Sequence, residues 1–351
     1  MKDPQQTMEA IRFTGQGRVP MRFGINGACW QNYPQEALLD LMEAHTYLFP
    51  DFVRPKLPYV PVFSPSCRAG TPYTDGFGCV WETTEDGIQG VVTGHPLADW
   101  QAFDTYAVPD FDKDMGVGPV DWAKEAHGLA LAREKGLPAA ASLYHGHTFL
   151  RLADIRGYEN LMYDMADEEP KLWELIERVE AFNMAVVKRY VAMDIDIMQY
   201  PEDLGMQNTP MLSPAHFRKY IKPSYRRIMQ PARDAGVMIH MHSDGYIRDL
   251  ADDLVDSGVH ILNLQDLVNG IDWIAERYAG RHCIQLDIDR QSVTPMGTPA
   301  QIDAHIREAV VKLGTKRGGL MMVYGLYPGV PLANVKAVMD AMEKYAFYWE
   351  G

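Results

Sequence analysis

From about residue 120 onward, segments with the helical spacing of apolar residues alternate with short, almost wholly apolar runs. Such runs are typical of parallel strands that are buried on both faces. Glycines follow several of the helical segments, where a left-handed C-cap favours glycine. The apolar runs lie at residues 139–144, 194–200, 236–242, 258–264, 282–288 and 318–324. Together with a strand expected near residues 22–27, they predict an α/β fold of the distorted (β/α)8 TIM-barrel class.

The N-terminal part of the chain has a different pattern. Residues 1–20 predict a helix or a tail, whereas residues 50–110 hold many of the prolines and glycines. Within that stretch, residues 79–84 and 87–92 predict two strands of a β-hairpin joined by a turn. The stretch is too rich in turn residues to form its own core. We therefore interpret it as an elaboration on a single barrel domain over residues 1–351, and we expect the eighth strand in this irregular part.

The composition narrows the class of partners. A formal net charge of −14 argues against nucleic-acid or anionic-membrane binding, which needs basic residues to neutralise phosphates. The four cysteines form no CxxC pair, the N-terminus has no apolar leader segment, and no apolar run is long enough to span a bilayer. No GxGxxG or Walker loop follows an expected strand. These features predict a cytoplasmic enzyme that binds neither membrane nor nucleic acid; the oligomeric state stays open, with a homodimer among the options.

Polar side chains follow six of the expected strands at the ends where (β/α) barrels carry their active sites. In chain order they are Tyr144, His145 and His147; Tyr200, Glu202 and Asp203; His240, His242, Ser243 and Asp244; Asn263, Gln265 and Asp266; Asp287 and Asp289; and Tyr324 and Tyr327. A ring of polar residues at successive strand ends predicts an active site.

The sharpest element of this ring is His240-Met241-His242. Residues i and i+2 of a strand point to the same side, so both imidazoles are expected to face one site. Two neutral imidazoles suit zinc, which takes three protein ligands and one open position in catalytic sites. Glu202, or failing that Asp203, could be the third ligand. The alternatives are that the two histidines bind substrate carboxylates, or that they cap the following helix together with Ser243 and Asp244.

The acidic residues of the ring have competing interpretations. Glu202 and Asp203 are adjacent and point apart, so we expect only one of them to reach the centre. Asp287 and Asp289 share one side of a strand, and their mutual repulsion would raise one pKa and make that group a proton donor. Alternatively, Asp289 pairs with Arg290 or caps the chain before Thr294. The tyrosines of the ring could wall an aromatic substrate or simply pack in the core.

Several segments resemble the uroporphyrinogen decarboxylase superfamily. They are DGFGCVWETTEDGIQGVVTGHPLADW (75–100), GYENLMYDMADEEPKLWELIERV (157–179), DIDIMQYPEDLGMQNTPMLSPAHFRKYIKP (194–223), GTPAQIDAHIREAVVKLG (297–314) and YPGVPLANVKAVMDAM (327–342). The resemblance implies a distorted (β/α)8 barrel with one of two activities. One branch decarboxylates uroporphyrinogen III without a metal; the other comprises zinc-dependent methyltransferases that work with corrinoid proteins.

Two departures from these branches are informative. The arginine-rich motif of the decarboxylases corresponds here to MRFGINGACW, in which the only arginine is Arg22. The HxC pair of the methyltransferases corresponds to His240 and His242, and no cysteine occurs in the MVYGLYPG segment. Glu202 is the best replacement ligand that the resemblance suggests, ahead of Gln265 and Tyr324. His/carboxylate ligation makes a harder zinc than thiolates do, which suits activation of an ether oxygen.

The resemblance therefore implies a zinc-assisted, corrinoid-protein-dependent methyltransferase of the O-demethylation type. It would move a methyl group from a small methoxylated, aromatic donor to Co(I) on a partner corrinoid protein. We assign zinc binding to His240, His242 and Glu202, and proton transfer to Asp203, Asp287 or Tyr324. Substrate binding is assigned to Tyr144, His145, Tyr200, Asn263, Gln265 and Tyr327. The alternatives are a metal-free decarboxylase-like lyase, in which His240, His242 and Arg22 hold a carboxylated aromatic, and a non-catalytic corrinoid- or ligand-binding barrel.

Overall fold

Seven strands form a parallel sheet arrangement within residues 5–350, which are the part of the chain that the computed structural model describes. The chain divides into two units. The first unit contains the described residues up to 68, residues 84–89 and the residues from 263 onward; the second contains residues 69–83 and 90–262. Strand β8 (Ile261–Gln265) crosses the boundary between them along the chain.

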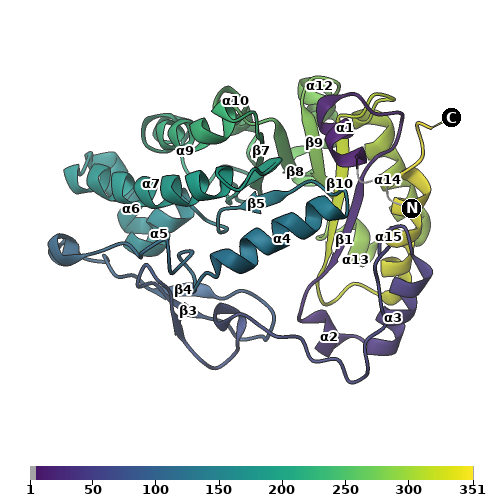
Figure 1. The fold of residues 1–351 in the computed structure, drawn as a ribbon, viewed down its shortest axis with the longest axis horizontal. Helices are drawn as coiled ribbons and strands as arrows, with labels where there is room; N and C mark the ends of the chain where they lie inside the picture. Colours follow the sequence, from purple (N-terminus) through teal and green to yellow (C-terminus); the bar gives the residue numbers. More distant parts are fainter. Residues whose placement is uncertain (1–4, 351) are drawn as a thin grey trace. The chain divides into compact units, whose positions relative to one another are not determined.

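In the second unit, parallel strands alternate with helices (Figure 1). Its parallel strands β5 (Ala140–Ser142), β6 (Ile197–Pro201) and β7 (Met238–Ser243) are neighbours in that order. The helices are α4 (Trp122–Glu134), α5 (Phe149–Arg156), α6 (Tyr158–Asp167), α7 (Pro170–Val191), α8 (Pro214–His216), α9 (Lys222–Asp234) and α10 (Arg248–Asp256). A 3-10 helix covers Trp100–Thr105, and a π-helical turn covers Phe217–Ile221.

Local sequence signals explain where these helices begin and end. Helix α4 begins after Asp121, whose carboxylate accepts the backbone N–H groups of Ala123 and Lys124. Helices α4 and α9 are followed by Gly136 (φ +69°) and Gly236 (φ +72°), which adopt the left-handed conformation that other residues avoid. The glycine C-caps predicted from the sequence are confirmed at both positions.

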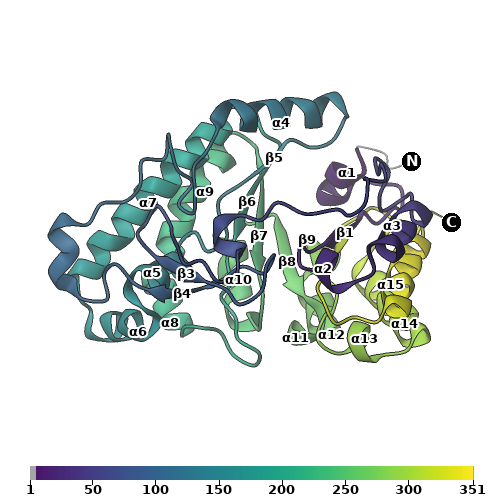
Figure 2. The ribbon, with the colours of Figure 1, turned by 90° about the horizontal axis from the view of Figure 1, so that it is seen from below.

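The first unit carries the other parallel strands, in the order β1 (Met21–Ile25), β10 (Leu320–Leu326), β9 (Cys283–Asp287) and β8. Its helices are α1 (Gln6–Arg12), α2 (Cys29–Asn32), α3 (Gln35–Ala44), α11 (Asp266–Asn269), α12 (Ile271–Tyr278), α13 (Val293–Met296), α14 (Pro299–Leu313) and α15 (Leu332–Tyr345), with a 3-10 turn at Pro65–Cys67. Helices α14 and α15 lie side by side (Figures 1 and 2). Their apolar faces are buried, and Asp303 binds Lys344 and Tyr345 at distances of 2.7 and 2.8 Å.

The predicted hairpin is confirmed as part of a three-stranded antiparallel sheet of the second unit, β2 (Tyr73–Thr74), β3 (Val80–Glu82) and β4 (Val91–Gly94). This sheet lies beside α5 (Figure 2). A buried carboxylate, Asp75, joins the two: it accepts the backbone N–H groups of Phe77 and Cys79 and the side-chain donors of Trp81 and Arg151. Arg151 lies on α5, so the elaboration is fixed to the main fold by a buried ion pair at 2.7 Å.

The predicted α/β fold of the TIM-barrel class is confirmed, and each of the seven predicted strands overlaps an observed one. The eighth strand expected in the N-terminal part does not form a parallel strand in residues 5–350; the strands found there are the short antiparallel ones. Of the predicted N-terminal helix or tail, residues 1–4 lie outside the described residues and α1 occupies Gln6–Arg12. The single-domain assignment over 1–351 stays a prediction. No helix in the described part is both long and apolar enough to cross a membrane.

Candidate metal centre

The ends of β5, β6 and β7 are held in register by backbone hydrogen bonds. Ser142 pairs with Gln199, and Pro201 pairs with His242. The bonding continues past the strands, because Gly146 N donates to the Pro201 carbonyl (2.9 Å) and Glu202 N donates to the His242 carbonyl (3.0 Å). The first residues after the three strands are therefore brought together by the sheet itself.

Three potential metal ligands converge at these strand ends, one from each strand. His145 Nε2 lies 3.3 Å from Asp203 Oδ1, and His242 Nε2 lies 3.6 Å from the same oxygen. The two imidazole rings have their centroids 5.8 Å apart. One ligand atom from each residue lies within 4.8 Å of the other two, a spacing that could hold one metal ion. We call these three residues the His145–Asp203–His242 cluster.

Two glycines bring the loops that follow β6 and β7 into backbone contact. A side chain on Gly245 (φ +80°) would lie 2.2 Å from the Gly205 carbonyl oxygen, and one on Gly205 would lie 2.5 Å from the backbone of Gly245. Tyr246 N donates to the Met206 carbonyl across the same contact (2.7 Å). The close approach places Asp244 N against Asp203 Oδ1 at 3.0 Å, which fixes the carboxylate that the two histidines share.

The charges within the cluster stabilise each other. Burial works against the charged form of Asp203, but the hydrogen bond to His145 and the positive charges of His145 and His242 lower the Asp203 pKa to about 2. Burial also opposes the charge on His145, yet the hydrogen bond to Asp203 and the nearby acids raise the His145 pKa above its ordinary value. Asp203 is therefore a carboxylate at neutral pH. Its role in proton transfer stays a prediction.

The donor set fits a catalytic zinc ion. Two imidazoles and one carboxylate supply three ligands, the number that leaves one position open for water or substrate. The side chains of His145, Asp203 and His242 are 36%, 29% and 19% exposed, so the site is reachable from solvent. The same donor set also suits Fe(II), which makes the identity of the metal a point for measurement.

Glu202 and His240, two of the three predicted zinc ligands, do not belong to this cluster. Glu202 is fully buried, and its Oε1 accepts the backbone N–H groups of Thr148 and Leu150, both at 2.9 Å. Its Oε2 accepts a hydrogen bond from Tyr225. Burial raises the Glu202 pKa to about 7 despite these donors. His240 is also buried, and it pairs with Gln199 in the strand register. The cluster thus keeps His242 from the predicted set and gains His145 and Asp203.

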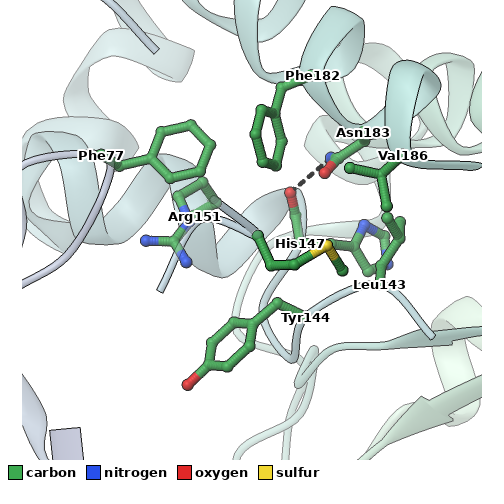
Figure 3. A pocket seen from close by; sticks show the side chains of 9 residues that line it. Phe77, Leu143, Tyr144, His147, Arg151, Phe182, Asn183 and Val186 are labelled. Carbon is green, nitrogen blue, oxygen red and sulfur yellow. Dashed lines mark hydrogen bonds between the residues drawn. The ribbon is translucent and has the colours of Figure 1, made fainter. Parts of the chain in front are cut away.

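A small cavity lies next to the cluster along the chain, and it holds at most about one water molecule. The cavity is lined by Tyr144, His147 and Arg151 (Figure 3). Aromatic and apolar side chains, among them Phe77 and Phe182, line the rest of it. His147 is uncharged at neutral pH, because burial and the positive charge of His145 lower its pKa to about 3. Arg151 was not identified from the sequence, since a single arginine within an apolar helical segment gives no signal of its own.

The remaining predicted residue of this unit, Tyr200, is a core residue. Its ring is fully buried and its hydroxyl donates to the Ile228 carbonyl at 3.2 Å. Tyr200 was predicted to bind substrate, and the structure instead engages its hydroxyl within the core.

The predicted residues of the first unit bind partners within that unit. Asp289 accepts the backbone N–H groups of Ser292 (2.8 Å) and Val293 (2.5 Å) and so caps the start of α13, as the alternative interpretation predicted. Asp287 lies 3.3 Å from the Arg290 guanidinium, which stacks over the half-exposed ring of Tyr327 at 5.4 Å. Asp287 and Asp289 thus bind separate partners, and proton transfer by Asp287 stays a prediction.

Three further predictions fall in the same unit. Tyr324 is fully buried and donates to Thr294 Oγ1 at 2.9 Å, and Asn263 donates to the Gln285 carbonyl at 2.8 Å. Gln265 lies at the end of β8, and its backbone carbonyl accepts a hydrogen bond from Asn269 at 3.1 Å. The hydroxyl of Tyr324 and the amide of Asn263 thus serve the framework, so the structure lends no support to the proton-transfer prediction for Tyr324.

Comparison with known proteins identifies relatives of two kinds. Residues 75–345 match the uroporphyrinogen decarboxylase (URO-D) family. A uroporphyrinogen decarboxylase from Thermus thermophilus is 28% identical over 137 residues, which are 38% of each chain. The enzyme of the same name from Gloeobacter violaceus is 26% identical over 53% of this chain and 52% of its own length. The matched parts thus span about half or less of these curated relatives.

A solved structure is similar over nearly the entire chain. The methyltransferase from Methanosarcina mazei aligns with a TM-score of 0.66 and 18% sequence identity, and the alignment covers 97% of this chain and 98% of that one. At this level of identity, the likeness shows the fold.

Proposed function

We propose that this chain, which belongs to the uroporphyrinogen decarboxylase family, is a zinc-assisted methyltransferase that uses the His145–Asp203–His242 cluster. Its methyl donor is a small methoxylated aromatic compound, and its acceptor is Co(I) of a partner corrinoid protein. The observation that carries the proposal is the convergence of three ligand atoms, one from each of three neighbouring strand ends, within 4.8 Å. The fold shared with the Methanosarcina mazei methyltransferase supports it.

The ligand chemistry explains the choice of donor. A zinc ion bound here would supply a Lewis acid for the ether oxygen of the donor. The negative charges of Asp203 and Asp244 lie beside the histidines of the cluster, and His242 Nε2 lies 3.6 and 3.7 Å from their carboxylate oxygens. The cysteine of this unit, Cys79, is buried against Arg151, and burial raises its pKa. Oxygen and nitrogen ligands without a thiolate make a hard site, which suits an oxygen-linked methyl group better than a thiol.

Metal content and methyl transfer test the proposal together. The purified protein should contain about one zinc per chain, as a catalytic site requires. It should convert cob(I)alamin to methylcobalamin in the presence of a methoxybenzoate, followed by the change in the cobalt absorption spectrum. His242→Ala should lose both the zinc and the transfer. The matched control is His127→Ala, which removes an exposed histidine of α4 in the same unit and should leave both unchanged.

Three results would contradict the proposal. They are a protein that binds no metal after incubation with zinc, a protein that selects iron over zinc, and a His242→Ala variant with full zinc content and full transfer. The choice of methoxybenzoate isomer is settled by the same assay, run with the methoxy group at each ring position.

A second candidate function is decarboxylation of a carboxylated aromatic without a metal, because the curated sequence relatives are uroporphyrinogen decarboxylases. This function predicts release of CO2 from uroporphyrinogen or a carboxylated aromatic by chelator-treated protein. It also predicts that His242→Ala changes substrate binding without any change in metal content.

A further inference from the structure

Glu202 contacts each of the elements that carry the three ligands. Its backbone N–H donates to the carbonyl of His242 on β7, and its own backbone leads directly to Asp203. Its side chain crosses to the segment after β5, where it accepts the N–H groups of Thr148 and Leu150, three and five residues beyond His145. We propose that Glu202 is the positioning residue that holds His145, Asp203 and His242 in one cluster, an inference that rests on the function proposed above.

The side chain of Glu202 adds a second hold on the segment after β5, beyond the backbone bonds that flank His145. The strand register fixes β6 to β7 as far as Pro201 and His242, so Asp203 and His242 are already held by main-chain bonds. His145 lies in a loop that has left β5, where the last paired residue is Ser142. Beyond that point, Leu143 N donates to the Gln199 carbonyl and Gly146 N to the Pro201 carbonyl, and Glu202 Oε1 then binds the loop twice more. Withdrawing this oxygen should loosen the segment after Gly146, and with it the placement of His145, while the main-chain bonds of Asp203 and His242 remain.

The carboxylate also replaces the usual helix cap of α5. Thr148 occupies the N-cap position, but its side chain makes no capping hydrogen bond, and Glu202 Oε1 binds the first N–H groups of the helix instead. Tyr225 OH and the buried environment hold the carboxylate from the other side. The start of α5 is therefore tied to the residue next to Asp203, so a shift of the helix would move His145 away from Asp203.

The proposal makes the reach of the side chain decisive, not its charge. Glu202→Gln keeps the length and one carbonyl oxygen, which can still accept from Thr148 N and Leu150 N. Glu202→Asp keeps a carboxyl group beside the metal site but withdraws the acceptor by one methylene. We expect the zinc dissociation constant of Glu202→Asp to rise about tenfold or more, as outer-shell changes do, and that of Glu202→Gln to stay within about threefold of wild type.

Two measurements on the full chain test this. The first is the zinc dissociation constant, obtained by competition with a chromophoric chelator. The second, which needs neither metal nor activity, is hydrogen exchange of the Thr148 and Leu150 amides, which should be slow in wild type, unchanged in Glu202→Gln and faster in Glu202→Asp. The control is Asp164→Asn, which removes the charge of another buried carboxylate of this unit, paired with Arg156 at 2.7 Å. It should lower stability and leave both readouts at the wild-type level.

Each outcome decides the matter. Weaker zinc binding in the glutamine variant than in the aspartate variant would show that charge matters and would overturn the proposal. Wild-type zinc affinity in Glu202→Asp would overturn it while leaving the proposed function intact. If the wild-type protein binds no zinc, the proposed function fails and amide exchange still tests the hold on the loop. If Glu202→Asp does not fold, exchange of the Thr148 and Leu150 amides at intrinsic rates in wild type overturns the proposal.

Discussion

Acids follow the strands of both units and contact histidines in both, but the two units use them differently. In the second unit, His145, Asp203 and His242 direct their ligand atoms toward one another and remain partly exposed. In the first unit, Asp266 is buried and accepts from His305 Nε2 (2.5 Å) and from Asp289 N (3.0 Å). Asp289 in turn caps α13. Acids at strand ends thus form a partly exposed cluster of potential metal ligands in one unit and an internal framework in the other.

The difference lies in what each carboxylate binds. Asp289 and Asp266 accept backbone N–H groups at the start of helices or loops, which consumes their lone pairs. Asp203 accepts one backbone N–H, from Asp244, and faces two imidazoles with the rest of its surface. An acid at a strand end therefore becomes available for chemistry when side chains, and not the backbone, are its main partners.

The largest effect that tests this comparison is on stability. His305→Ala should lower the free energy of unfolding by about 3 kcal/mol, because it leaves the buried Asp266 carboxylate without its cationic partner. His242→Ala should change it by less than about 1 kcal/mol, since Asp203 keeps His145 and Asp244 N. Urea unfolding of both variants, followed by circular dichroism, measures the two values. Equal losses of unfolding free energy in the two variants would show that His242 and His305 contribute alike to stability, and would contradict the comparison.

The pH dependence of stability gives a second, smaller contrast. Burial opposes the charge on His305, but its hydrogen bond to Asp266 and the charges of Asp266 and Asp289 raise its pKa in the folded state. The pair should therefore stabilise the fold fully below the unfolded pKa of about 6.5, and this contribution should be lost as pH rises through the raised folded value. We expect the difference in unfolding free energy between wild type and His305→Gln to shrink from pH 6 to pH 9. A difference that grows with pH would show that His305 is neutral in the fold.

The smallest expected effect concerns Tyr324, predicted from the sequence as a proton donor. Tyr324→Phe should cost about 1 kcal/mol, the net contribution of one buried hydrogen bond, because it leaves Thr294 without its donor. Methyl transfer should stay at the wild-type rate. Loss of methyl transfer with unchanged stability would show that Tyr324 takes part in the reaction and is not only a structural residue of the first unit.

The fold was predictable because its signals are local. Apolar runs bounded by glycines located all seven parallel strands, and the turn around Gly87 located the hairpin. The eighth strand was inferred from the class of fold alone, with no run of residues to carry it. In the described chain, that region instead forms the short antiparallel sheet that Asp75 fixes to α5.

The sequence predicted where the candidate site lies, but it predicted only some of the residues that form the cluster. Strand ends identified His145, Asp203 and His242, yet His145 was assigned to substrate and Glu202 was preferred over Asp203 as a ligand. Sequence spacing shows that two adjacent acids point apart, but not which one turns inward. That choice depends on the contact between Gly205 and Gly245 and on two N–H groups about fifty residues away in the chain, which no local pattern reveals.

The buried ion pair between Asp75 and Arg151 has a consequence for engineering. Because Asp75 takes four donors from both the elaboration and α5, the antiparallel sheet is no detachable appendage. Deleting the sheet would leave the buried guanidinium of Arg151 without its carboxylate partner. Moving the sheet to another protein would need a helix there with an arginine at the position that corresponds to Arg151. Chimaeras between relatives should therefore exchange the sheet and α5 as one cassette.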